Sequence, residues 1–268
     1  MTGFSIIVPT WNNLDYLDLA YRSLTRHSAA AHEIIVFFNE IDERAARWAG
    51  ERGVRHASSP QNLGVCGAVN RAAAMATREF LCFFNDDMVA LPGWDTAFAP
   101  YLGLADKLWL SGTAVEAGKA TACYLGGHDY GSSPADFQEE RLLGECGRLV
   151  RPYNVVSTWT PIVMPRRNWE EVGGFDEAYF PGNGSDPDLA MKMYAFGCRR
   201  FIGVGASLVY HFSRRTVSRF DGQELMDPKA YFKTKWGMSW KRFLNGTLHR
   251  DEVITPDLVR RLGWEEAV

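Results

Sequence analysis

The first apolar run of the chain is Phe4-Ser5-Ile6-Ile7-Val8, and Pro9 follows it. Its β-branched and aromatic side chains predict a buried strand, and Leu14, Leu17 and Leu24 then recur at helical spacing. The alternation continues, with strands predicted at 33–38, 54–57 and 79–84 and helices at 42–52 and 64–77. Strands that are apolar on both faces and alternate with helices predict a parallel sheet covered by helices.

The second half of the chain is less regular. Strands are predicted at 108–116, 155–164 and 200–212 and helices at 166–172 and 187–196, whereas 126–147 is rich in glycine and has no clear period. From Asp221 onward the sequence is more basic and aromatic, which predicts a helical appendage. Since no repeat or linker interrupts 1–220, we expect one continuous α/β domain there and the appendage at 221–268.

Composition narrows the class of protein. The 268 residues are 46% hydrophobic and 23% charged, which is typical of a globular protein, and the formal charge of −3 argues against a non-specific nucleic-acid binder. Five cysteines without a C-x-x-C pair imply neither a disulfide framework nor a zinc site. The sequence shows no signal-peptide pattern and no run of 18 apolar residues, so a cytoplasmic location is expected.

Polar residues follow the predicted parallel strands, where such sheets bind their ligands. Thr10 and Asn12 follow the first strand, Asn39 follows the second, and Asn85-Asp86-Asp87 follows the strand at 79–84. Two adjacent carboxylates repel each other unless a cation shares them, and oxygen ligands suit Mg²⁺ or Mn²⁺. A solvated turn would explain the same residue types, because Asn and Asp are common in turns.

A second pair of carboxylates lies in Asp186-Pro187-Asp188, at the start of a predicted helix. Helix capping accounts for this pattern, with Asp186 as N-cap, Pro187 at the first helical position and Asp188 in the first turn. The preceding small residues Gly182-Asn183-Gly184-Ser185 would also allow a substrate to approach closely. A carboxylate at this position could then act as a general base.

Three further patterns have both a structural and a functional interpretation. His211 ends an apolar run, which is typical of a histidine in the core. Arg214 and Arg215 follow it, and this pattern would also suit a metal ligand beside two arginines that bind a diphosphate. The segment from Asn62 to Gly67 precedes a helix and could approach a nucleotide, although this glycine pattern is weak. The aromatic stripe of the appendage is expected to pack on the domain, with contact to a membrane surface as the alternative. Its members are Phe232, Trp236, Trp240 and Phe243.

Taken together, these segments resemble family 2 glycosyltransferases with the GT-A fold. The matching segments are residues 5–12, 62–70, 84–87, 166–177 and 185–189, together with His211. The resemblance covers about residues 4 to 215 and is specific because several segments match in order. It implies a Rossmann-like, mostly parallel sheet flanked by helices, with a donor-nucleotide half at about 1–117 and a mixed acceptor half at about 118–220.

The resemblance also implies roles for individual residues. Asp87 and His211 match metal ligands, with Asp86 close to the ribose or sugar of the donor, and Asp186 matches the general base. The positions that it places near the nucleotide or its diphosphate are Thr10, Asn12, Asn39, Asn62, Gly67, Arg214 and Arg215. Two positions depart from the family pattern. Ser185 stands where the family has Glu, so Asp188 remains an alternative general base. Asn39 stands where an Asp is usual, which leaves open whether the nucleobase is uracil, thymine or guanine.

The expected activity is the transfer of a sugar from a nucleoside-diphosphate donor to a hydroxyl of a saccharide or glycoconjugate. The transfer is expected to invert the anomeric configuration and to depend on Mn²⁺ or Mg²⁺. The acceptors considered include a lipid-linked one at the inner face of the membrane. No nucleic-acid partner is expected, and the oligomeric state stays open. One alternative is a sugar nucleotidyltransferase, which would need a basic loop where Pro9 to Leu14 contains no Lys or Arg. The other is a non-catalytic nucleotide-sugar binding protein, which Ser185 favours.

Overall fold

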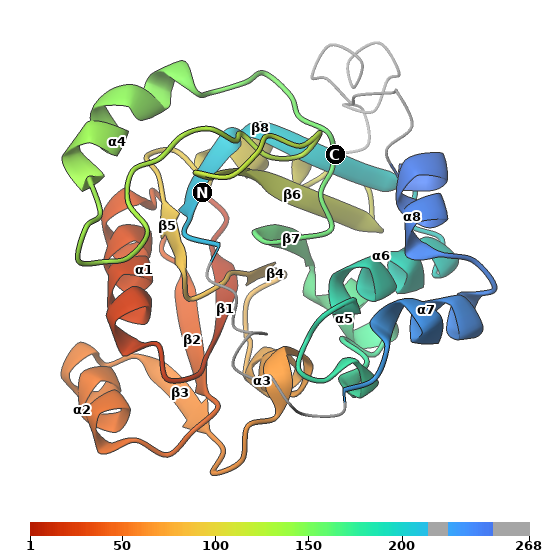
Figure 1. Ribbon diagram of the computed structural model, residues 1–268, viewed down its shortest axis with the longest axis horizontal. Coiled ribbons are helices and arrows are strands. Elements are labelled where there is room, and N and C mark those ends of the chain that lie inside the picture. The colour runs from red at the N-terminus through yellow and green to blue at the C-terminus, as the bar shows by residue number, and fades with distance from the viewer. Residues whose placement is uncertain (214–224, 249–268) are drawn as a thin grey trace.

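Eight strands form a single sheet in the computed structural model, which describes residues 1–213 and 225–248 (Figure 1). The strand order is β3-β2-β1-β4-β7-β6-β8-β5. The strands are β1 (Phe4–Thr10), β2 (Glu33–Phe38), β3 (Arg55–Ser58), β4 (Phe80–Phe83), β5 (Met88–Ala90), β6 (Leu108–Val115), β7 (Ile162–Pro165) and β8 (Arg200–His211). The larger helices are α1 (Leu14–His27), α2 (Glu43–Arg52), α3 (Gly64–Ala73), α4 (Glu139–Glu145), α5 (Arg166–Glu171), α6 (Ser185–Ala195) and α7 (Pro228–Trp236).

The first four strands of the chain pair in parallel, as the sequence predicts. All seven residues of β1 are buried, because helices cover both faces of the sheet. Ile6 packs with Leu17 of α1 and Trp48 of α2 in one core cluster, whereas Ile7 packs with Val69 of α3 in the other. Successive residues of a strand point to opposite faces, so this split follows directly from the strand geometry.

The second half of the sheet is mixed. β7 is antiparallel to both β4 and β6, β8 is parallel to β6, and the short edge strand β5 is antiparallel to β8. The prediction of a strand over 155–164 is wrong for its first seven residues, since β7 begins only at Ile162. Pro161 has no N–H to donate to a ladder, and the residues before it are held by side-chain hydrogen bonds instead.

The start of α6 differs from the prediction. The helix begins at Ser185, and Gly184 occupies the N-cap position with a φ of 89°. A positive φ favours glycine, and a Cβ on Gly184 would lie 2.8 Å from the Trp240 ring. Asp186 is therefore not the N-cap residue but lies inside the first turn, so capping does not explain its presence.

The described part of the C-terminal region is helical. It comprises α7, α8 (Trp240–Phe243) and a π-helical turn, η5 (Leu244–Leu248). Gly237 ends α7 in a left-handed conformation, so the aromatic stripe is divided between two helices. Phe232 and Phe243 are buried in the core cluster that contains α6, as expected of a stripe that packs on the domain. Within the two described ranges, no helix is both long enough and apolar enough to cross a membrane.

Candidate active site

The carboxyl ends of β1, β2 and β4 meet at one edge of the sheet, as parallel pairing requires. Thr10 ends β1, and its carbonyl oxygen accepts a hydrogen bond from the Asn39 amide at 2.9 Å. Half-buried Asp86 lies in the turn after β4, at the same edge. The Thr10 hydroxyl is buried and has no hydrogen-bond partner among the described residues. Buried polar groups are rarely left unpaired, so this hydroxyl fits contact with a ligand.

Asn39 and Asn62 hold the turn that leads into α3. The Asn39 side chain donates to the Gly64 carbonyl at 3.2 Å and accepts from the Leu63 amide at 3.0 Å, while Asn62 accepts from the Gly64 amide. These contacts orient the start of α3. A Cβ on Gly67 would lie 2.9 Å from that of Leu63, so close packing already requires glycine there.

Asn12 stands at the same edge in an unusual backbone conformation. Its φ is 49°, and its backbone amide donates to a carboxylate oxygen of Glu40. Asn tolerates this left-handed region better than most residues do, which accounts for its occurrence at the turn after β1. Arg214 and Arg215 lie outside the described residues.

Asp87 and His211 are 124 positions apart in the chain but adjacent in the structure. Antiparallel pairing places Met88 of β5 opposite His211 of β8, so Asp87 lies beside the histidine. The Asp87 Oδ1 and His211 Nε2 atoms are 3.3 Å apart, and Glu116 Oε1 lies 2.7 Å from His211 Nδ1. Burial by itself would lower the pKa of His211, but the carboxylates of Asp87 and Glu116 outweigh it and raise that pKa to about 10.

Sequence reasoning missed Glu116. It directly follows β6, which runs parallel to β8 with Val115 opposite Tyr210, so the sheet itself carries Glu116 to the histidine. The available signal was its place at the end of a predicted strand, which is the same signal that singled out Asp87. The position of a residue at the end of a strand does not reveal which other strand ends lie beside it, because the order of strands in the sheet determines those neighbours.

The donor set at this place fits a divalent cation that is shared with a ligand. Among the described residues, no three His, Cys, Asp or Glu side chains converge as a metal-binding group. Asp87 and His211 offer one carboxylate oxygen and one imidazole nitrogen, a combination that Mn²⁺ accepts. Cations of this kind bind commonly through one or two protein ligands, with substrate phosphates and water completing the shell.

Asp186 lies in the first turn of α6. Burial raises the pKa of its carboxyl to about 7, which is within the range in which general bases operate. The carboxylates of Asp186 and Glu116 both act on the same phenol, because after burial their charges help to raise the pKa of Tyr124.

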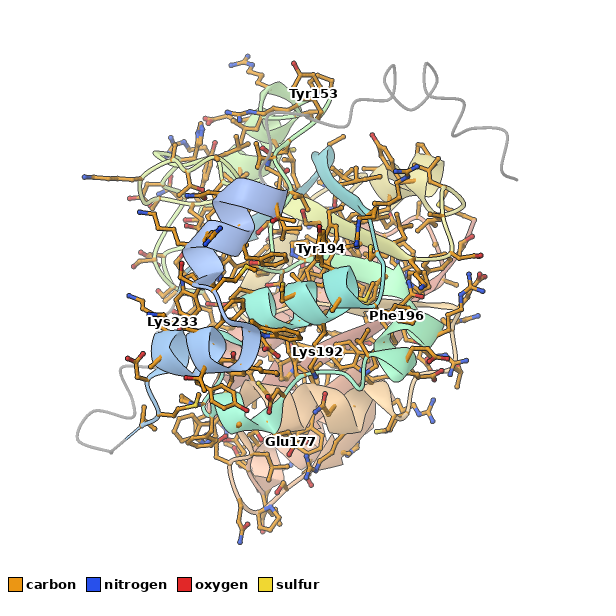
Figure 2. The ribbon with its side chains drawn as sticks, turned by 90° about the vertical axis from the view of Figure 1, so that its right-hand side faces the viewer. Tyr153, Glu177, Lys192, Tyr194, Phe196 and Lys233 are labelled. Atoms are coloured by element: carbon orange, nitrogen blue, oxygen red, sulfur yellow. The ribbon has the colours of Figure 1, made fainter. Side chains whose placement is uncertain are left out.

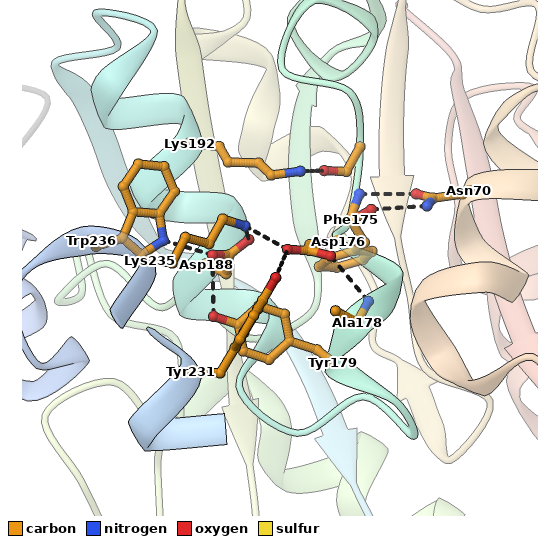
Figure 3. Close-up of polar contacts among 11 residues, drawn as sticks. Asn70, Phe175, Asp176, Ala178, Tyr179, Asp188, Lys192, Tyr231, Lys235 and Trp236 are labelled. Atoms are coloured by element: carbon orange, nitrogen blue, oxygen red, sulfur yellow. Dashed lines mark hydrogen bonds and ion pairs between the residues drawn. The ribbon is translucent and has the colours of Figure 1, made fainter. Parts of the chain in front are cut away.

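Asp188 is in a different environment, although it is only two residues away (Figure 3). Its side chain is completely buried and accepts hydrogen bonds from the Trp236 indole at 2.7 Å and the Tyr179 hydroxyl at 3.2 Å. The Lys235 ammonium lies 2.8 Å from Asp188 and 2.7 Å from Asp176, and Tyr231 donates to the same Asp176 oxygen at 3.0 Å. This cluster joins η3 (Glu177–Tyr179), α6 and α7, which lie side by side in Figure 2.

The mixed sheet flanked by helices has the GT-A fold, and solved structures share it. GalNAc-T7 with UDP, GalNAc and Mn²⁺ matches 99% of this chain and 57% of its own, with a TM-score of 0.62 at 12% identity. S. aureus TarS matches 86% of this chain and 38% of its own, with a TM-score of 0.58 at 15% identity.

Sequence comparisons match part of this chain to a glycosyltransferase family. Residues 5–122 match the model of glycosyl transferase family 2. The O-antigen biosynthesis protein RfbC of Myxococcus xanthus is 29% identical over 226 residues, which cover 78% of this chain. The chain spans only 17% of the length of that relative. The resemblance to family 2 glycosyltransferases drawn from the sequence is confirmed over residues 5–122.

The buried ion pair predicts a strong and specific effect on stability. Replacing Lys235 by Met leaves the Asp188 carboxylate buried without its cation, which we expect to lower the free energy of unfolding by about 3–5 kcal/mol. Lys233→Met is the matched control, because Lys233 is exposed on the same helix and its loss should change stability by no more than about 0.5 kcal/mol. Thermal unfolding of both variants measures the difference, and equal melting temperatures would contradict this role of Lys235.

Proposed function

We propose that this protein is an inverting glycosyltransferase that moves a sugar from a nucleoside-diphosphate donor to a hydroxyl of a saccharide or glycoconjugate. The observation that carries the proposal is the contact between Asp87 and His211 near the carboxyl edge of the sheet. Asp87 and His211 form a cation-competent pair, and Asp186 is a carboxylate whose pKa is raised to about 7. The name of the relative RfbC supports an acceptor in polysaccharide biosynthesis.

In the proposed reaction the donor lies along the edge formed by β1, β2 and β4. Thr10 contacts the nucleoside through its buried hydroxyl, while Asn12 and Asn39 shape the turns around it. Asp87 and His211 would hold Mn²⁺ or Mg²⁺, which would neutralise charge on the leaving diphosphate. Asp86 is proposed to contact the ribose or the sugar, as the family resemblance implies.

Asp186 is the proposed general base. The acceptor oxygen attacks the anomeric carbon as its proton passes to Asp186, and the bond from that carbon to the diphosphate oxygen breaks. One displacement on the face opposite the leaving group inverts the anomeric configuration, without a covalent enzyme intermediate. Asp188 is the weaker candidate for this role, because Lys235, Trp236 and Tyr179 already contact its carboxylate. Ser185 does not supply the second carboxylate that the family pattern usually has.

We expect nucleotide binding to depend on a divalent cation. Titration calorimetry with UDP, GDP and TDP should give a preferred nucleotide whose affinity is higher with Mn²⁺ than with EDTA. Asp87→Asn should weaken the Mn²⁺-dependent binding by about tenfold or more, because a contact with a charged group contributes about 1.5–3 kcal/mol. Equal affinities of the wild-type protein in Mn²⁺ and in EDTA would contradict the metal assignment.

We expect Asp186→Asn to lower the rate of sugar transfer by about 10²–10⁴-fold and to leave nucleotide affinity unchanged. In the wild-type protein the transfer rate should rise with pH through about 7, as the carboxyl loses its proton. The measurement is a pH profile of transfer for wild type and variant. A variant with full activity and an unchanged profile would contradict the role of Asp186.

We expect Asp186→Asn to stabilise the protein even though it lowers the rate of sugar transfer. This effect on stability can be measured without an acceptor. The raised pKa of Asp186 means that the folded state resists ionisation, while the unfolded carboxyl ionises at about pH 4. Asp186→Asn should therefore raise the melting temperature at pH 8, and the gain should vanish below about pH 4. Asp188→Asn is the matched control and should lower the melting temperature, because it removes the charge that Lys235 neutralises.

A further inference from the structure

Trp159 is a large aromatic residue that stands exposed in a buried segment. Its side chain is 42% accessible, whereas Ser157, Thr158 and Thr160 are each no more than 3% accessible. Exposing an indole to water is unfavourable by roughly the 1.5–3 kcal/mol that burial of a large apolar side chain contributes. The exposure of Trp159 is therefore a feature for which packing gives no reason.

The backbone around Trp159 is held in place. Ser157 accepts from the Trp109 indole through its carbonyl at 3.0 Å and donates its amide to the Ser111 hydroxyl at 2.8 Å. The Trp159 amide in turn donates to the Ser157 hydroxyl at 2.9 Å, and the Pro161 carbonyl accepts from Gly112 of β6. The segment that carries the indole is thus already ordered, so less conformational entropy is lost when a ligand binds.

Tyr124 pairs with this indole. The two ring centroids are 5.8 Å apart and the rings are inclined by 58°. Tyr124 is positioned by its neighbour Leu125, whose backbone bonds to Ala114 and Glu116 at the end of β6. The Glu116 amide donates to the Leu125 carbonyl, which places Tyr124 near the contact between Glu116 and His211. The aromatic pair extends from there to solvent at Trp159.

We propose that Tyr124 and Trp159 form the subsite that binds a sugar ring of the acceptor, an inference that rests on the proposed function. One face of a pyranose presents C–H groups that pack on an aromatic ring, and its hydroxyls project from the rim. A sugar seated on the pair would lie near the end of β6, where Glu116 contacts His211. A lipid surface needs a broader apolar patch than the two rings of Tyr124 and Trp159 provide. The acceptor class is therefore a saccharide rather than a bare polyol or a lipid tail.

The test uses fluorine NMR on protein labelled with 5-fluorotryptophan. The Trp159 signal is assigned from the spectrum of Trp159→Phe, and the remaining tryptophans serve as internal controls. The probes are methyl glycosides of glucose, galactose, N-acetylglucosamine and rhamnose, with sorbitol as a hydroxyl-rich compound that has no ring. At least one glycoside should shift the Trp159 signal saturably, while sorbitol and phosphatidylglycerol vesicles leave it unchanged.

Two variants test the contribution of each ring. Tyr124→Ala should weaken the best glycoside by about two- to tenfold, the size expected of one aromatic contact, and Trp159→Tyr should retain most of the affinity of the wild type. The proposal is overturned if no glycoside moves the Trp159 signal, or if sorbitol or vesicles move it equally. Nucleotide calorimetry on the same sample separates the two claims. Intact Mn²⁺-dependent binding with a silent Trp159 rejects the subsite alone, whereas loss of nucleotide binding rejects the proposed function.

Discussion

The candidate active site depends on the antiparallel pairing of the three-residue strand β5 with β8. All three residues of β5 are buried, and the backbone amide of Ala90 donates to Ser23 of α1. This pairing reverses the chain immediately after Asp87 and places its carboxylate beside His211. Because β8 also runs parallel to β6, the same strand brings Glu116 to the other nitrogen of that histidine. One short edge strand therefore determines the geometry of the proposed cation site.

Asp186 and Asp188 are identical side chains in different environments. They lie two positions apart at the start of α6, so their directions from the helix differ by about 200°. Asp188 points into the cluster with Lys235 and Trp236, which neutralises and holds it. No cation among the described residues pairs with Asp186, and burial raises the pKa of its carboxyl. The two carboxylates therefore differ in environment although they share one helix turn.

The largest error in the secondary-structure prediction coincides with the proposed acceptor subsite. Residues 155–161 read as a strand because they are apolar and β-branched, but they form an irregular segment before β7. Within this segment Thr158 and Thr160 are buried, and Trp159 between them is in contact with solvent. The indole therefore lies on a part of the chain that joins no neighbouring strand in a regular ladder.

The sequence by itself determined the alternation of strands and helices, the parallel half of the sheet and the polar residues at its carboxyl edge. These features follow from periodicity and from the residues that directly follow each strand, both of which are local properties. The sequence did not determine that Glu116 would join His211, that Asp188 would pair with Lys235, or that Gly184 rather than Asp186 would cap α6. Each of these depends on the order of strands or on packing between segments tens of residues apart. Only the tertiary structure decides such contacts, because they arise from which surfaces are buried together.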